Sequence, residues 1–416
     1  MSSSTVDHAA ASPHSGIGFL EFIALLAALM ALNALSIDIM LPALPLIGED
    51  LAVYDPNNRQ LLITAYLTGL AVASLVFGPL SDWLGRKKVL LFGLALFTVG
   101  TVFSATAETF ETMLIARVIQ GVGAASPRVM SISMVRDWYS GRQMGRVMSL
   151  AMTVFMIAPI VAPSIGQSVL LVGPWRWVFF LLTVVGTVIL LWSALRLPES
   201  LPPENRRKIG FRSVLSAYKS TLTIRLTFGY MLAASLVMGC LFGFINSSQQ
   251  IFMDVFKLEE SFPLIFGFIA LSLAASSFIN AQLVERWGLR KLSHAAVLCF
   301  TLVNIINAII GYTEHASLWN FVLLQFVAMF FFGFIGANFN TMAMEPLGKI
   351  AGTGSAMLGF FTTMVGALLG AGIGHFFDHS TLPYTLSCAI LGLAATLVVF
   401  ITEKGRLFNP HYESNL

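Results

Sequence analysis

The stretch GPLSDWLGRKK, residues 78–88, joins the end of one apolar segment to the start of the next. Its last nine residues align with LVERWGLRK at 283–291, an offset of 203 residues in a chain of 416. In each copy an acid precedes a glycine, and basic residues follow the glycine within three positions. Glycine permits a tight turn, and Lys and Arg anchor a helix at anionic lipid. The alignment therefore predicts two copies of one helical unit, placed one after the other in the chain.

The composition predicts a membrane protein, because 56% of the residues are hydrophobic and only 11% are charged. Soluble domains are about one-quarter charged. Apolar segments of about 20 residues, enough to cross roughly 30 Å of hydrocarbon, recur along the chain. They lie near 18–46, 59–80, 88–107, 109–136, 143–171 and 174–197, and then near 222–252, 262–284, 291–312, 317–344, 352–376 and 383–403. The expected fold is an all-α membrane protein of twelve transmembrane helices in two six-helix bundles, with a central cavity between the bundles.

The positions of the basic residues predict the orientation. Nineteen Lys and Arg residues fall in one set of loops and ends, whereas the opposite loops hold only Arg59, Arg176 and Lys257. Cytoplasmic loops keep basic residues, so we expect both termini in the cytoplasm. The expected divisions are a cytoplasmic tail (1–17), an N-terminal bundle (18–197), a cytoplasmic linker (198–221), a C-terminal bundle (222–403) and a second cytoplasmic tail (404–416). The second part of the linker has two open interpretations, a helix along the lipid headgroups or a flexible tether.

Several other classes of function find no support in the sequence. The net charge of +3 is small and the bases are scattered, which argues against nucleic-acid binding. His375 and His379 have the spacing of zinc ligands, but no third ligand is apparent, so we interpret them as an exposed helix end and expect no metal. No phosphate-binding loop of an ATPase is present, so we expect no enzyme activity and no cofactor, and a proton gradient as the energy source.

The motif quoted at the outset resembles the loop between the second and third helices of the major facilitator superfamily, G-x-L-x-D-x-x-G-R-K. Asp82, Gly85 and Arg86 occupy the matching positions, and the resemblance covers essentially the whole chain. It implies the two-bundle fold expected above and a gating role for this loop, which in the family holds the cytoplasmic side shut. Trp83 departs from the pattern, since many members carry a base there.

A second stretch, FMIAPIVAPSIGQ at 155–167, resembles the antiporter motif of the same superfamily, with Pro163 and Gly166 at matching positions. Small residues four positions apart let helices approach closely, and proline removes a backbone hydrogen bond and bends the helix. We assign Pro163 and Gly166 to gating by this resemblance. Packing alone would also produce such a pattern.

The stretch LSIDIMLPALPLI at 35–47 resembles the first helix of the Bcr/CflA drug-resistance exporters, and MEPLGKIAGTGSAM at 344–357 resembles their tenth-to-eleventh helix connection. The resemblance implies a proton-coupled multidrug efflux antiporter of a bacterial inner membrane that confers antibiotic resistance by exporting bicyclomycin, chloramphenicol or florfenicol. Because Met30 stands where some related exporters carry a second acid, we expect small amphiphilic, mostly neutral drugs. The alternatives are a proton-linked transporter of a metabolite such as a sugar or peptide, and a transporter-like receptor. We expect the protein to act as a monomer in the bilayer, with drug and protons as its partners.

Asp38 is the only carboxylate well inside a predicted span, and an ionised group at membrane depth is costly enough to suggest a function. Asp38 and Arg117 each lie about eight residues, roughly 12 Å, from the outer end of their helices, so we expect them at one depth. By the same resemblance, the Asp and the Arg of the R-x-x-Q-G pattern at 117–121 line the proton and drug pathway. We assign Asp38 as the proton-coupling carboxylate and Arg117 as its partner. The alternative is a permanently charged structural pair.

Four polar residues are the candidates for substrate contact: Asn33, Tyr66, Asn246 and Gln249. They lie among many Phe and Met residues, and a mostly apolar pocket with a few polar groups suits an amphiphilic ligand. Hydrogen bonding between helices is the alternative role for each of them. Arg128 is left open between a functional role and a structural one.

Overall fold

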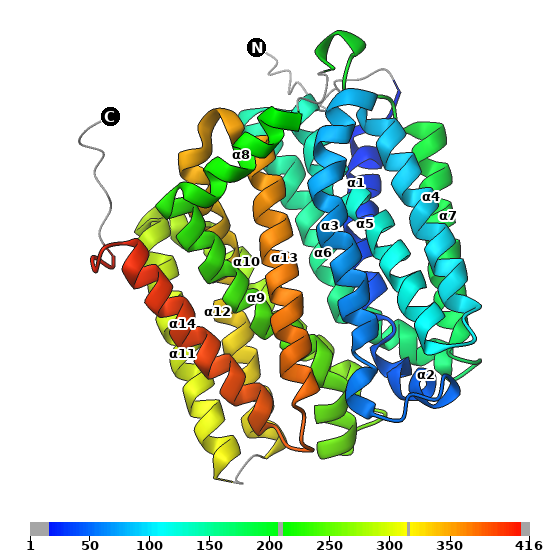
Figure 1. Cartoon of the computed structure of the whole chain (residues 1–416), viewed down its shortest axis with the longest axis vertical. Helices are drawn as coiled ribbons and strands as arrows, with labels where there is room; N and C mark the ends of the chain where they lie inside the picture. The colour runs from blue at the N-terminus through cyan, green and yellow to red at the C-terminus, as the bar shows by residue number, and fades with distance from the viewer. Residues whose placement is uncertain (1–15, 207–210, 314–316, 409–416) are drawn as a thin grey trace, which may run out of the picture.

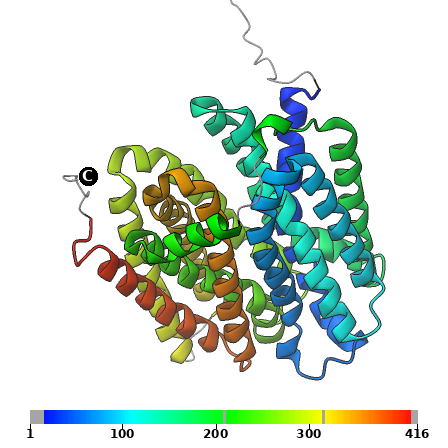
Figure 2. The same cartoon turned by 45° about the horizontal axis from the view of Figure 1, so that its top comes forward.

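The computed structural model describes residues 16–206, 211–313 and 317–408, so most of both expected tails lies outside the described residues. Within them, twelve helices have 20 or more residues and form two bundles side by side (Figures 1 and 2). The N-terminal bundle contains α1 (Phe19–Asp38), α3 (Leu61–Leu84), α4 (Arg86–Ala105), α5 (Phe110–Trp138), α6 (Gly141–Leu170) and α7 (Arg176–Arg196). The C-terminal bundle contains α9 (Arg225–Gln249), α10 (Phe262–Trp287), α11 (Leu289–Tyr312), α12 (Leu318–Met344), α13 (Ala351–His375) and α14 (Leu382–Thr402).

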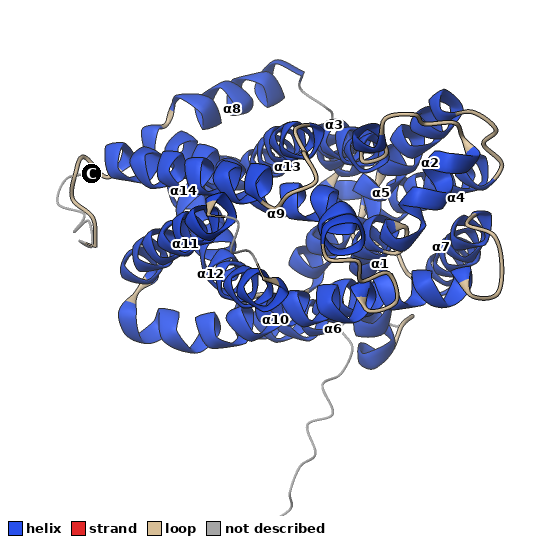
Figure 3. Cartoon of the chain, turned by 90° about the horizontal axis from the view of Figure 1, so that it is seen from below, coloured by secondary structure: helices blue, strands red, loops and turns tan. Residues whose placement is uncertain are grey.

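The expected fold class is confirmed: the described part of the chain is helical, without strands (Figure 3), and eleven of its helices are long and apolar enough to cross a membrane. The long helix missing from those eleven is α5, which carries Arg117 and Arg128 in its middle. Charged side chains lower the apolarity of a span, and they are tolerated where they face the interior of the bundle. Of the twelve long helices in the described part of the chain, α5 is therefore the one best suited to a functional role.

The first span is broken at Asp38. The sequence predicts one apolar run over 18–46, whereas α1 ends at Asp38 and the chain continues through a short 3₁₀ turn into α2 (Leu44–Asp50). Pro42 lacks the N–H that would bond the Asp38 carbonyl, four residues earlier, and this explains the break. The carboxylate thus stands where the helix ends inside the protein.

The two copies of the quoted motif form similar turns. Gly85 has φ 103° and ψ 152°, Gly288 has φ 79° and ψ 156°, and each directly precedes a helix. A positive φ favours glycine at both positions. We call the end of the molecule that carries the Gly85 turn the motif end, and the opposite end, which carries α2, the far end.

The second part of the linker is a helix, α8 (Phe211–Thr223), which runs along the outside of the bundles (Figure 3). The Tyr218 hydroxyl donates to the Leu75 carbonyl of α3, at 2.9 Å. The linker helix is therefore attached to the N-terminal bundle by a specific contact.

Candidate functional site

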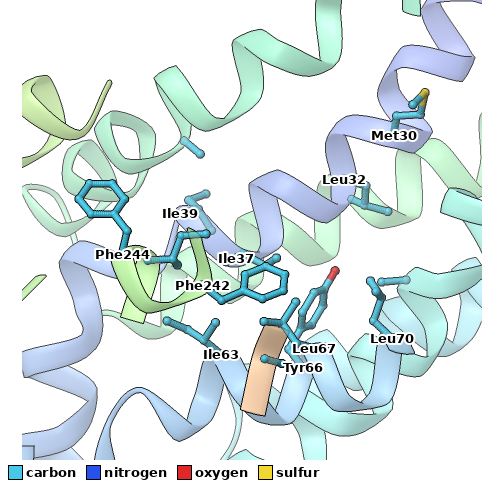
Figure 4. Packing of buried hydrophobic residues seen from close by; sticks show 14 of the residues in the cluster. Met30, Leu32, Ile37, Ile39, Ile63, Tyr66, Leu67, Leu70, Phe242 and Phe244 are labelled. Atoms are coloured by element: carbon cyan, nitrogen blue, oxygen red, sulfur yellow. The ribbon is translucent and has the colours of Figure 1, made fainter. Parts of the chain in front are cut away.

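Asp38 is 4% exposed, and its Oδ1 atom is buried without a hydrogen-bond partner among the described residues. Its neighbours Ile37 and Ile39 belong to a cluster that also holds Phe242 and Phe244 of α9 (Figure 4). The acid therefore lies in an apolar region that residues of both bundles form. A buried carboxylate is costly unless it is hydrogen-bonded or paired with a counter-charge, and among the described residues Oδ1 has no hydrogen-bond partner in this conformation.

Arg117 is fully buried and is held by three acceptors. Its guanidinium donates to the Leu62 carbonyl of α3 at 3.2 Å, to the Ser36 carbonyl of α1 at 3.2 Å and to Gln120 Oε1 at 2.5 Å. It also lies over the Tyr66 ring, 4.6 Å from the centroid. One side chain of α5 thus connects α1, α3 and α5.

Asp38 and Arg117 are not paired in this conformation. Arg117 contacts the carbonyl of Ser36, two residues before Asp38, which is consistent with similar depths for the two side chains. Within the described part of the chain, however, the donors of Arg117 go to neutral acceptors and no ion pair joins it to Asp38. Their expected partnership remains a prediction, and a direct contact would require a rearrangement of one of them.

Asn33 and Tyr66 have partners within the N-terminal bundle. The Tyr66 hydroxyl donates to Asn33 Oδ1 at 3.2 Å, and Asn33 Nδ2 donates to the Ala124 carbonyl at 3.2 Å. These bonds link α1, α3 and α5, as the helix–helix alternative requires. Their role in substrate contact stays a prediction.

Asn246 and Gln249 lie on α9. Both amide atoms of Asn246 are buried without a partner among the described residues, so this side chain retains its full hydrogen-bonding capacity. Gln249 Nε2 contacts Met253 Sδ at 3.6 Å, a weak acceptor. Of the four candidates, Asn246 is therefore the one most available to a polar ligand.

Gly166 brings α6 against the break in the first span. A Cβ atom at this position would overlap the Ile39 carbonyl oxygen, directly after Asp38. The same helix contains Pro159 and Pro163, each of which removes one backbone hydrogen bond of the helix. The antiporter-like stretch is thus in backbone contact with the segment that carries the candidate proton site.

Arg86 lies at the centre of a polar cluster at the motif end. Its guanidinium forms ion pairs with Asp82 at 2.6 Å and with Asp137 at 3.0 Å, and its backbone N–H donates to Glu199 Oε1 at 2.8 Å. A Cβ at Gly85 would overlap Glu199 Oε2. The gating residues expected from the motif, Asp82, Gly85 and Arg86, therefore all lie together.

The sequence analysis assigned no role to Asp137 or Glu199, the other two acids that contact Arg86. The internal repeat could have pointed to these acids. In the second half, Arg290 pairs with Glu345 at 3.2 Å and with Glu403 at 3.3 Å. Glu403 follows Glu199 by 204 residues, close to the offset of the repeat. Extending the alignment to the last helix of each half would have found this pair of acids.

A cavity of about 270 Å³ lies between the bundles and reaches the motif end. The N-terminal bundle contributes its charged lining: Asp82, Arg86, Arg128 and Arg136. The C-terminal bundle contributes a neutral wall that includes Val237, Met238, Phe332 and Ile335. Asn33, Tyr66, Asn246 and Gln249 do not line this cavity in the present conformation.

The bundles are hydrogen-bonded to each other at the far end. Asn57 Nδ2 donates to the carbonyls of His375 and Phe377, both at 3.0 Å, and Gln250 Nε2 donates to Asn57 Oδ1 at 2.6 Å. Nearby, Gly374 lies so close to Gln60 that a Cβ would overlap it. We call Asn57 and its three partners the far-end clamp.

The family model for the Major Facilitator Superfamily matches residues 26–371. Among curated proteins, the chain is 31% identical to an uncharacterized MFS-type transporter, YdgK, of Bacillus subtilis, covering 92% of this chain and 95% of that one. It is 26% identical to a bicyclomycin resistance protein homolog of Haemophilus influenzae, over 92% and 96% of the two chains. It is 28% identical to the multidrug resistance protein MdtL of Escherichia coli, over 93% and 96%.

Solved structures share the fold at low sequence identity. The xylose transporter XylE of E. coli, in a partially occluded inward-open conformation, superimposes with a TM-score of 0.71 at 14% identity, over 92% of this chain and 97% of that one. The human organic anion transporter MFSD10 gives a TM-score of 0.69 at 18% identity, over 91% and 98%.

Proposed function

Because the chain belongs to the major facilitator superfamily, we propose that it is a drug/proton antiporter of a bacterial inner membrane, with both termini in the cytoplasm. Its proposed substrates are small amphiphilic, mostly neutral antibiotics of the phenicol or bicyclomycin type. Relatives that cover almost the whole chain are named for bicyclomycin resistance and multidrug resistance, which supports this class. The observation that carries the proposal is Asp38, a buried acid with a free oxygen at a helix break.

Asp38 can couple the two fluxes if it releases its proton on one side of the membrane only. The positive-inside rule favours a cytoplasmic motif end, so the cavity would open toward the cytoplasm while the far-end clamp closes the outside. Deprotonation of Asp38 there would leave a buried charge that needs a partner, and Arg117 lies beside the same segment. A bound drug and a proton would then stabilise different states of one site, which is the basis of exchange.

The cavity supports an amphiphilic substrate. Its wall on the C-terminal bundle is mostly apolar, and apolar contact supplies affinity while a few polar groups orient the ligand. We propose that Asn33, Tyr66, Asn246 and Gln249 contact the drug at a later stage, after it moves from the motif end toward Asp38.

The experiment compares an efflux-deficient bacterium that expresses the intact chain, Asp38→Asn or Asp378→Asn at matched membrane abundance. The Asp378→Asn variant makes the same chemical change at an exposed position and serves as the control. We expect the intact chain and Asp378→Asn to raise tolerance to phenicols or bicyclomycin, and Asp38→Asn to lose all protection. Inverted membrane vesicles should release protons from their lumen on addition of the same drug, except with Asp38→Asn.

Two results would contradict the proposal. Equal protection by the intact chain and Asp38→Asn would make Asp38 a structural acid and remove the proposed coupling. If neither protein protects against any compound, transport of a metabolite such as a sugar or peptide replaces drug export.

A further inference from the structure

The cavity carries an asymmetric distribution of charge. Among the described residues, its charged lining residues all belong to the N-terminal bundle and comprise three arginines and one aspartate. Arg86 is already paired with two carboxylates, Asp82 at 2.6 Å and Asp137 at 3.0 Å. Arg128 and Arg136 form no ion pair with any carboxylate in the described part of the chain. The cavity therefore has a net positive lining that the fold itself does not neutralise.

Arg128 is the deeper of these two cations along α5. It lies two turns before Arg136, which occupies the last turn of the helix at the motif end. Arg128 is solvent-accessible, and its Nη1 donates to the Thr363 hydroxyl of α13 at 3.3 Å. This neutral partner belongs to the opposite bundle and occupies one of the five N–H donors of the guanidinium. No other hydrogen-bond partner of Arg128 is found among the described residues, so the remaining donors are available to a ligand.

We propose that the cavity binds amphiphilic organic anions, with Arg128 as the anchor for a carboxylate or a similar anionic group. The proposal rests on the transport function proposed above and extends its substrates from neutral drugs to anions. A planar guanidinium matches a carboxylate in a two-bond arrangement. The apolar body of the ligand would lie against Met238, Phe332 and Ile335 on the opposite wall.

The same contact links binding to the arrangement of the two bundles. A ligand anion competes with the Thr363 hydroxyl for Arg128, so binding weakens a hydrogen bond that joins α5 to α13. Arg136 at the mouth adds a second positive charge and draws anions toward the cavity. Neutral drugs with oxygen acceptors can accept hydrogen bonds from the same guanidinium, but they lack the negative charge that would pair with it.

The test measures binding to the purified full chain in nanodiscs of zwitterionic phosphatidylcholine, by calorimetry without a proton gradient. The probes are 1-naphthylacetate and its neutral isostere 1-naphthylacetamide. We expect the intact protein to bind the carboxylate at least about tenfold more tightly than the amide, as one charge-assisted hydrogen bond allows. Arg128→Gln keeps a donor for Thr363 but removes the charge, and it should abolish this preference while binding the amide normally. Arg128→Lys should keep part of it.

Retained binding of the amide shows that the variant is folded. Equal affinity for both probes in the intact protein, absence of carboxylate binding, or an unchanged preference in Arg128→Gln would each overturn the proposal. Arg136→Gln should reduce the preference only slightly, and a complete loss there would assign the site to the mouth instead. Because the assay involves neither Asp38 nor transport, its outcome is separate from the outcome of the export experiment.

Discussion

Arg117 is a buried cation with structural contacts at the candidate functional site. The sequence predicts it at the depth of Asp38, and the structure surrounds it with the carbonyls of Leu62 and Ser36, the Gln120 amide and the Tyr66 ring. The bond to Gln120 continues to Thr101 of α4, because Gln120 Nε2 donates to the Thr101 hydroxyl at 2.9 Å. Removal of the guanidinium N–H groups of Arg117 would leave several buried acceptors without partners.

We therefore expect Arg117→Lys to destabilise the protein, because an ammonium group cannot reach acceptors on three helices in the planar arrangement of a guanidinium. The loss should be about 3 kcal/mol, the scale of one or two charge-assisted hydrogen bonds. The measurement is the fraction that remains monodisperse in detergent after heating. Arg136→Lys, at an exposed position on the same helix, is the control and should match the intact protein. Equal heat resistance of the two variants would show that the three bonds contribute little.

The backbone of helix α6 contacts the segment that follows the candidate proton site. Gly166 lies against the Ile39 carbonyl, and the first span is broken directly before Ile39. Close approach of two backbones requires the absence of a side chain. The contact explains why a glycine is needed at this position of the antiporter-like stretch.

Gly166→Ala should push α6 away from the segment after Asp38. We expect a loss of about 1–3 kcal/mol from overpacking, together with reduced drug export per folded molecule. Gly145→Ala on the same helix meets no atom within 4 Å and is the control; it should be neutral or slightly stabilising, because alanine favours a helix. Heat resistance in detergent and export normalised to abundance are the two measurements. Normal stability and export in Gly166→Ala would argue against a close α1–α6 contact.

At the scale of the whole molecule, the far-end clamp joins the two bundles at one end, and a cavity, which the Arg128–Thr363 hydrogen bond crosses, lies between them toward the other. Asn57 holds the far end through two carbonyls of the C-terminal bundle and the Gln250 amide. The cavity lies at the motif end, where the cluster around Arg86 stays within the N-terminal half. A rocking motion of the bundles would have to break the clamp before the far end can open.

Asn57→Ala should shift the protein toward conformers in which the motif end is closed. Three hydrogen bonds are lost, each with a net contribution of about 0.5–1.5 kcal/mol, so the ratio of conformers closed at the motif end to conformers open there should rise at least about tenfold. Spin labels at Trp83→Cys and Trp287→Cys, exposed positions on α3 and α10, report the separation of the bundles at the motif end. We expect shorter distances in Asn57→Ala and unchanged distances in Asn58→Ala, the neighbouring control. Identical distance distributions in all three proteins would exclude the clamp as a determinant of conformation.

Much of this arrangement could be predicted from local sequence. Span length, the repeated turn and the relative depth of Asp38 and Arg117 follow from apolar runs and from residue counts along helices. The break after Asp38 could have been predicted from Pro42, since the missing N–H lies four residues after the acid. The pairing of Arg86 with Asp137 and Glu199 was harder, because those acids are 51 and 113 residues away from it in the chain.

The sequence by itself determined the fold class, because the alternation of apolar spans and basic loops is set by the bilayer and needs no knowledge of neighbours. Only the tertiary structure decided which polar groups meet. It placed the donors of Arg117 on neutral acceptors, Asn57 across the bundle interface and Arg128 on the wall of the cavity. The physical reason is that a buried polar group in a membrane protein must form hydrogen bonds with its spatial neighbours. Packing determines these neighbours, because it brings together helices that are far apart in the chain.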